Sequence, residues 1–207
     1  MSKVIIFNAP PQSGKDTVVD LIKMVDFQSN MFKSLEHLSF KEPLIKLVLN
    51  FFEIDRDFWD EHYTSEGKEI KRDWLNGMSQ REALIWMSED CVKPKCGKEF
   101  FGEKVAESIE EDGNTVYLFS DGGFNEELQP IIRKVGAENV FIVRIERDGY
   151  TFEGDSRNYI DVPEIPDQNY LYIMNLGDMD DLLDEVYEFI DYLSLRGVFN
   201  SKYVVTN

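Results

Sequence analysis

The feature that most constrains this chain is the passage from an apolar strand to a glycine–lysine turn near its start. Residues 4–8 form a β-branched and aromatic run, Gly14-Lys15 follows, and apolar residues then recur at helical spacing from Val18 to Val25. A strand, a tight loop and a helix in this order gather backbone N–H groups and the positive end of a helix dipole around one anion. A lysine at the helix start can reach the terminal phosphates of a nucleotide. The passage therefore predicts a phosphate-binding loop, or P-loop.

Two positions of this loop depart from the usual pattern. Ala9 stands where the first glycine falls, and Asp16 stands where a serine or threonine would bind magnesium. Asp16 and Thr17 are the candidate magnesium ligands, because a carboxylate holds the ion directly or through water. The alternative for Asp16 is charge complementarity with the helix N-terminus, and the alternative for the whole passage is an ordinary strand-to-helix turn. The loop residues predicted to bind ATP are Pro11, Gln12, Ser13, Gly14, Lys15, Asp16 and Thr17.

Length and composition indicate one soluble α/β domain. The chain has 207 residues, 43% of them hydrophobic, and no apolar run long enough to span a membrane. No signal peptide is visible at the N-terminus, so we expect a cytoplasmic protein that does not bind membranes. Cys91 and Cys96 are too few for a disulfide framework and suit a reducing cytosol.

The charge is strongly acidic and unevenly distributed. There are 22 Lys and Arg against 40 Asp and Glu, a net charge of −18, which disfavours a nucleic-acid partner. Residues 161–195 contain ten acidic side chains and no lysine or arginine, whereas residues 33–104 contain twelve basic and fifteen acidic ones. Any surface that handles phosphate outside the loop is therefore expected in the middle of the chain.

Strands alternate with helices along the sequence. Further strands are expected at residues 115–120, 139–145 and 170–174, and helices at 41–52, 99–110 and 124–135, the last interrupted early by Pro130. Ser79 and Glu82 form a capping box that opens another helix. The last helix carries an apolar face, and the stretch 53–76 is expected to hold short helices and loops. This alternation predicts a three-layer α/β P-loop fold with a mainly parallel sheet, one domain over residues 1–207.

Several charged residues outside the loop suit phosphoryl transfer, which depends on positioning and charge neutralisation. Asp121 directly follows a buried strand, where a second carboxylate would act on metal or substrate, although a turn-forming role is the alternative. Arg144, Arg147 and Arg157 bracket a loop over residues 146–160 that could close as a lid, and Arg81 begins a helix where its charge opposes the dipole. Each arginine alone reads equally as a surface residue, and Lys68 as part of a solvated face.

Four segments together resemble the bacteriophage deoxynucleoside monophosphate kinase family, a group of P-loop kinases. The segment 13–17, Ser-Gly-Lys-Asp-Thr, is similar to the family's Gly-Lys-Asp-Thr loop, and the segment 79–84 is similar to its Pro-Arg-Glu helix start. The segment 121–126 resembles Asp-x-Arg-Phe-x-Asn-Glu, and the segment 173–178 resembles the final strand and adenine-side turn. Gly123 stands where the family has an arginine, and residues 155–157 replace its His-x-Ser-Glu.

The resemblance implies transfer of the γ-phosphate of ATP to a deoxynucleoside monophosphate, with magnesium required, in host cytoplasm if a bacteriophage encodes the chain. It implies catalytic roles for Lys15, Asp16, Asp121, Arg147 and Arg157. It further implies ATP contacts from Arg144, Asn175 and Gly177, acceptor contacts from Lys68, Arg81 and Asp121, and an inserted acceptor-binding region over residues 33–112. Arg81 or Lys68 is expected to compensate for the arginine missing at Gly123. A kinase of another small acceptor, a nucleotide-binding protein without catalysis, and a homodimer all stay open.

Overall fold

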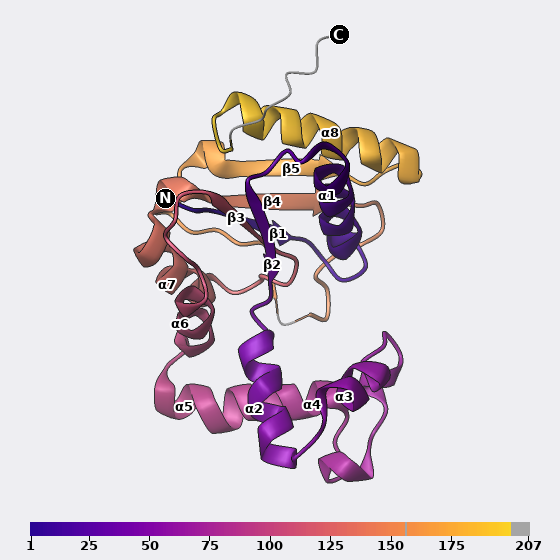
Figure 1. The fold of residues 1–207 in the computed structure, drawn as a ribbon. Helices are drawn as coiled ribbons and strands as arrows, with labels where there is room; N and C mark the ends of the chain where they lie inside the picture. The colour runs from indigo at the N-terminus through magenta and orange to yellow at the C-terminus, as the bar shows by residue number, and fades with distance from the viewer. Residues whose placement is uncertain (156, 200–207) are drawn as a thin grey trace.

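The computed structural model describes residues 1–155 and 157–199, and its centre is a parallel sheet (Figure 1). Among these residues the sheet has five strands in the order β2-β3-β1-β4-β5. The strands are β1 (Lys3–Asn8), β2 (Ser34–Leu38), β3 (Thr115–Phe119), β4 (Val140–Glu146) and β5 (Tyr170–Met174). The central strand β1 pairs with both β3 and β4, where Ile5 lies opposite Leu118 and Phe141. The loop that follows β1 therefore emerges in the middle of the sheet's carboxyl edge.

Helices cover both faces of the sheet, which confirms the predicted three-layer α/β architecture. Helices α1 (Lys15–Ser29) and α8 (Met179–Leu195) share one face, and α6 (Phe100–Glu107) and α7 (Asn125–Val135) cover the other. Side chains alternate along a strand, so Ile5 and Phe7 pack in the α1 and α8 core while Val4 and Ile6 pack in the opposite one. The loop after β1 is thus anchored by two cores.

A helical region lies beside the carboxyl edge of the sheet, at the bottom of Figure 1. It is built from α2 (Glu42–Phe52), α3 (Arg56–His62), the 3₁₀ turns η1 (Gly67–Glu69) and η2 (Asp73–Leu75), α4 (Gln80–Ile85), the π-helix η3 (Trp86–Val92) and α5 (Lys93–Cys96). This region has a core of its own that includes Val48, Trp59 and Leu75. The predicted insertion of residues 33–112 is therefore wider than this region, because β2 belongs to the sheet and α6 covers it.

Local signals specified most of these elements. The capping box is present as predicted: the Ser79 hydroxyl accepts a bond from the Glu82 N–H, and the Glu82 carboxylate accepts one from Ser79. The π-helix was not foreseen; in it the Lys93 N–H bonds to the Ser88 carbonyl, five residues back. Strand β2 was missed as well, because it is half exposed at the sheet edge and lacks a continuous apolar run.

The predicted interruption at Pro130 is wrong. Helix α7 runs without a break from Asn125 to Val135, with Pro130 buried inside it. A proline at the sixth helical position removes one N–H, which would have bonded to the Glu126 carbonyl in the first turn, and the remaining ladder continues. The 3₁₀ turns η4 (Ala137–Asn139) and η5 (Asp167–Asn169) lead into β4 and β5. Within residues 1–155 and 157–199, no helix combines the length and the apolar character needed to cross a membrane.

Candidate functional site

The loop between β1 and α1 adopts a conformation that only glycine fits at position 14. Gly14 has a φ of +97°, and a Cβ built there would lie 2.6 Å from the Asn175 side-chain nitrogen. Asn175, from the turn after β5, donates this nitrogen to the Ser13 carbonyl at 3.0 Å. The structure therefore brings together two segments of the predicted nucleotide site that are 162 residues apart in sequence.

Lys15 begins α1 and is held inside the loop. Its side chain is 9% exposed, and its ammonium donates to the carbonyls of Ala9 at 2.7 Å and Pro10 at 2.8 Å. Burial lowers the Lys15 pKa to about 8, and the positive charges of Arg157 and Lys41 act in the same direction. The ammonium is thus held against the loop backbone by these two carbonyls.

Ala9 belongs to the apolar core beneath the loop. It is 1% exposed and packs with the α1 residues Val18 and Val19. A larger side chain would need space that this core does not offer. Packing therefore accounts for a small residue at the position where the usual pattern has glycine.

The first turn of α1 fits a magnesium ion that is held mostly by phosphate and water. Asp16 is exposed there and Thr17 is half-buried. In the described parts of the chain there is no group of three or more His, Cys, Asp or Glu side chains that could hold a metal. Magnesium commonly takes one or two protein ligands and fills its other positions with water and substrate phosphates, so this small donor set suits it.

The Ser13 hydroxyl is a buried donor without a partner in the described part of the chain. A buried hydroxyl is usually hydrogen-bonded, because leaving it unpaired costs free energy. A phosphate oxygen seated in the loop would give it a partner. This orphaned hydroxyl is consistent with a loop shaped for an anion.

The three predicted lid arginines occupy different places. Arg147, just after β4, donates to the Gln12 carbonyl at 3.0 Å and so joins the lid to the P-loop. Arg144, within β4, donates to the Ile160 carbonyl at 2.9 Å and lies over the rings of Tyr159 and Tyr170. This bond fixes the end of the predicted lid loop, at Ile160, against β4.

Arg157, the third of them, forms an ion pair with Asp155 at 2.7 Å and faces a cavity. The Asp155 carboxylate is bonded to the Arg157 guanidinium, which lowers the Asp155 pKa to about 2.

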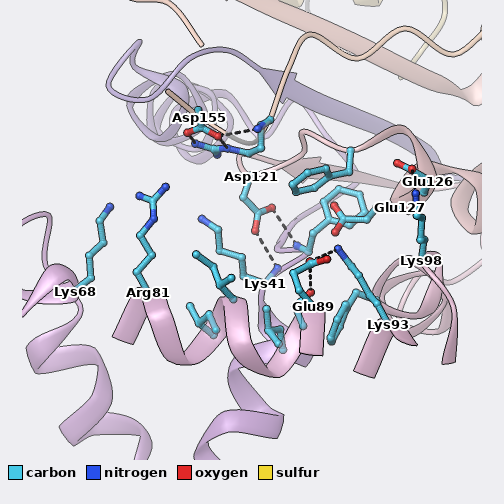
Figure 2. A pocket seen from close by; sticks show the side chains of 18 of the residues that line it. Lys41, Lys68, Arg81, Glu89, Lys93, Lys98, Asp121, Glu126, Glu127 and Asp155 are labelled. Carbon is cyan, nitrogen blue, oxygen red and sulfur yellow. Dashed lines mark hydrogen bonds and ion pairs between the residues drawn. The ribbon is translucent and has the colours of Figure 1, made fainter. Parts of the chain in front are cut away.

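The cavity lies between the helical region and the carboxyl edge of the sheet (Figure 2). It has a volume of about 620 Å³, within the range of small-molecule sites. The three predicted acceptor-binding residues, Lys68, Arg81 and Asp121, all line it. Lys68 and Arg81 lie at one end, and Glu126, Glu127 and Lys98 lie at the other.

Asp121 has a role that the sequence did not suggest. Its carboxylate accepts hydrogen bonds from the Ser39 hydroxyl, from the Phe40 N–H at 3.0 Å and from the Lys41 N–H at 3.1 Å. These bonds tie the end of β3 to the chain that enters α2. Asp121 therefore fixes the helical region against the sheet while one side of it faces the cavity.

Arg157 fills the space beside Gly123. A Cβ placed on Gly123 would lie 2.7–2.9 Å from three carbons of the Arg157 side chain. Gly123 thus leaves room for the Arg157 side chain at a position where the family that the sequence resembles has an arginine. Arg157, which the sequence predicted as a lid residue, is therefore a third candidate for the compensation expected from Arg81 or Lys68.

Gly177 follows β5 in the same turn as Asn175. It precedes Asp178, whose side chain caps α8 in a second capping box with Asp181. A Cβ on Gly177 would collide with the Asp181 carboxylate. The residue thus allows the tight turn that presents Asn175 to the P-loop.

Glu127 is the cavity residue that sequence reasoning missed most completely. It is 8% exposed, and burial raises its pKa to about 7. Ser88, Glu89 and Lys93 from the π-helix and its end were also missed; Lys93 pairs with Glu89 at 2.7 Å. No spacing rule marks these residues, because the packing of α6, α7 and η3 brings them together.

Comparisons with known proteins add little to this geometry. No protein-family model matches the chain, and no curated protein matches it. Among solved structures, it is similar to a gluconokinase from Sinorhizobium meliloti 1021 with a TM-score of 0.39 and 9% sequence identity, over 94% of this chain and 97% of that one. At this TM-score the likeness carries no inference about what the chain binds or does.

Proposed function

We propose that this protein is a magnesium-dependent kinase that transfers the γ-phosphate of ATP to a deoxynucleoside monophosphate. The observation that carries the proposal is a cavity with a cationic end next to a phosphate-binding loop. Arg157 and Lys41 line the cavity, and both are close enough to Lys15 to lower its pKa. A donor phosphate in the loop and an acceptor phosphate in the cavity would therefore be neighbours.

The residues around the loop suit the donor. Lys15 would hold the β- and γ-phosphates, and the backbone N–H groups from Ser13 to Thr17 would surround them. Magnesium, held by Asp16 and Thr17 together with phosphate and water, would neutralise charge on the transferred group. Arg147, already bonded to the loop, is placed to contact the same phosphates.

The residues around the cavity suit the acceptor. Lys41 and Lys68 make no ion pair with any described residue, so their charges are available to a phosphate. Arg81 is held 3.4 Å from Glu69, an exposed pairing that contributes little stability. The rest of the wall includes four aromatic rings, which suit a planar base: Phe40, Tyr63, Phe101 and Phe124.

The test is a turnover assay with ATP, magnesium and a panel of nucleoside and deoxynucleoside monophosphates, in which ADP formation is followed. We expect turnover on at least one deoxynucleoside monophosphate, and about a 100-fold or greater loss in Lys15→Ala, the scale of removing one preorganised charge-stabilising donor. Lys46→Ala is the matched control, because Lys46 is an exposed lysine of α2 outside the cavity.

Two outcomes would contradict the proposal. Intact ATP binding without turnover on any monophosphate would favour a binding protein. Turnover only on a small acceptor without a base would favour a kinase of another class.

A further inference from the structure

The two ends of the cavity differ in what their charges are paired with. At the first end, Lys68 makes no ion pair with a described residue, and Arg81 is paired with the exposed Glu69 at 3.4 Å. At the other end each lysine is paired: Lys93 with Glu89 at 2.7 Å, and Lys98 with Glu126 at 3.6 Å. The remaining charge-bearing group there is Glu127, and none of its side-chain oxygens is hydrogen-bonded to a described residue. An acceptor with a phosphate at the first end would therefore meet an unpaired carboxyl at the second.

The backbone of Glu127 is fixed beside the cavity. A Cβ on Gly102 of α6 would lie 2.2 Å from the Glu127 carbonyl oxygen, so the two helices are in backbone contact at this point. The Glu127 N–H is bonded to the Phe124 carbonyl at 3.2 Å, which fixes the start of α7. The side chain is 8% exposed and ends at the cavity wall. Burial disfavours the ionised form of this carboxyl, and a bound molecule that brings a hydrogen-bond donor stabilises it.

The neighbours of Glu127 indicate the chemistry of that donor. Phe101 and Phe124 line the same cavity, and their rings suit the face of a planar heterocycle. An exocyclic amino group at the edge of such a ring donates to a carboxyl oxygen whether the carboxyl is ionised or neutral. At the position where adenine and cytosine carry this amino group, thymine and uracil present a carbonyl oxygen, which cannot donate a hydrogen bond to an ionised carboxylate and is repelled by it.

We propose that Glu127 selects the base of the acceptor by accepting a hydrogen bond from its exocyclic amino group. The protein then acts on deoxynucleoside monophosphates with adenine or cytosine in preference to thymidine monophosphate. This inference rests on the proposed kinase function, and it adds the specificity of the acceptor site. A carboxyl built to bond an amino group discriminates strongly against a base without one, because the buried group is then left unpaired.

The experiment compares kcat/KM at pH 8, where the Glu127 carboxyl is mostly ionised, for the four common deoxynucleoside monophosphates in the wild type and in Glu127→Gln. We expect the best amino-bearing substrate to exceed thymidine monophosphate by roughly 10- to 100-fold, the range of a hydrogen bond to a charged group. Glu127→Gln should lower this ratio about 10-fold or more, mainly through KM, because the amide also donates to a carbonyl oxygen. Glu107→Gln, an exposed change on α6 outside the cavity, should keep the wild-type ratio.

The inference is overturned if thymidine monophosphate is used as well as every amino-bearing substrate, or if Glu127→Gln leaves the ratio unchanged. Calorimetric titration of the wild type with each monophosphate, without ATP, separates this failure from failure of the proposed function. Preferential binding of amino-bearing nucleotides without any turnover would remove the kinase and keep the selectivity. An absence of binding by all four would remove both. The wild-type panel decides the matter even if the variant does not fold.

Discussion

Replacement of Glu127 by glutamine should make the folded protein more stable above pH 7. The wild-type carboxyl has a pKa of about 7 in the folded chain, against 4.5 for an unperturbed glutamate, because burial disfavours its charged form. Between these two pH values the folded state holds a proton that the unfolded state has released. Raising the pH through this window therefore favours unfolding.

The size of the effect follows from the two pKa values. Each pH unit of the window costs about 1.4 kcal/mol, so Glu127 alone lowers the free energy of unfolding by about 3 kcal/mol between pH 4.5 and pH 7. The charged groups that act on it are Lys93, which opposes the effect, and Asp121, Glu126 and Glu89, which add to it. Glutamine does not titrate, so the variant lacks this loss.

Urea unfolding of the wild type and Glu127→Gln at pH 4.5, 6, 7 and 8 measures the difference directly. The gap between the two free energies of unfolding should widen by about 3 kcal/mol from pH 4.5 to pH 7 and then stay constant. Titrations common to both proteins cancel in this difference. Glu107→Gln, on the exposed side of α6, should run parallel to the wild type. A gap that is flat across the series would refute the argument that this carboxyl is buried and unpaired.

Three further perturbations test the contacts around the loop and lid. Gly123→Ala should displace the Arg157 side chain and raise KM for the acceptor by up to about 100-fold, as a misplaced positioning group does; an unchanged KM would separate Arg157 from the acceptor. Asp155→Asn should lower the melting temperature at pH 7, because the depressed Asp155 pKa stabilises the folded state above pH 3.8 and loses that effect as the pH falls toward 2; equal melting temperatures at pH 7 would contradict this. Asp16→Ala should raise the magnesium concentration needed for half-maximal turnover, and an unchanged requirement would assign Asp16 to the helix dipole alone.

Features with local causes could be predicted from the sequence. The β1–loop–α1 passage, the Ser79 capping box and the final helix each depend on residues a few positions apart, and each is present. The parallel sheet follows from the alternation of strands and helices. Asp121 was selected by its place after a buried strand, Arg81 by its charge at a helix start and Lys68 through the resemblance, and the structure gathers all three at one cavity.

Features that depend on distant contacts could not be predicted. Gly123 makes room for the Arg157 side chain, and Asp121 accepts hydrogen bonds from the Ser39–Lys41 turn. Glu127 is buried where its backbone contacts Gly102. Each of these pairs is separated by more than twenty residues, and nothing in the spacing of either partner refers to the other. A glutamate in the first turn of a helix ordinarily reads as a solvated residue that complements the dipole. Only the approach of α6 to α7 makes it a buried group.

In the proposed function, the way the loop holds Lys15 would make nucleotide binding a proton-linked reaction. With a pKa of about 8, the ammonium is partly deprotonated in mildly alkaline solution, and incoming phosphate favours its charged form. Binding at pH 8 should therefore take up about half a proton per nucleotide, which appears as a dependence of the calorimetric heat on the ionisation enthalpy of the buffer. The affinity for ATP then declines above this pH because the lysine, not the nucleotide, has changed its charge. The burial of Lys15 under the loop, together with the nearby charges of Arg157 and Lys41, would thus set the alkaline limit of nucleotide binding.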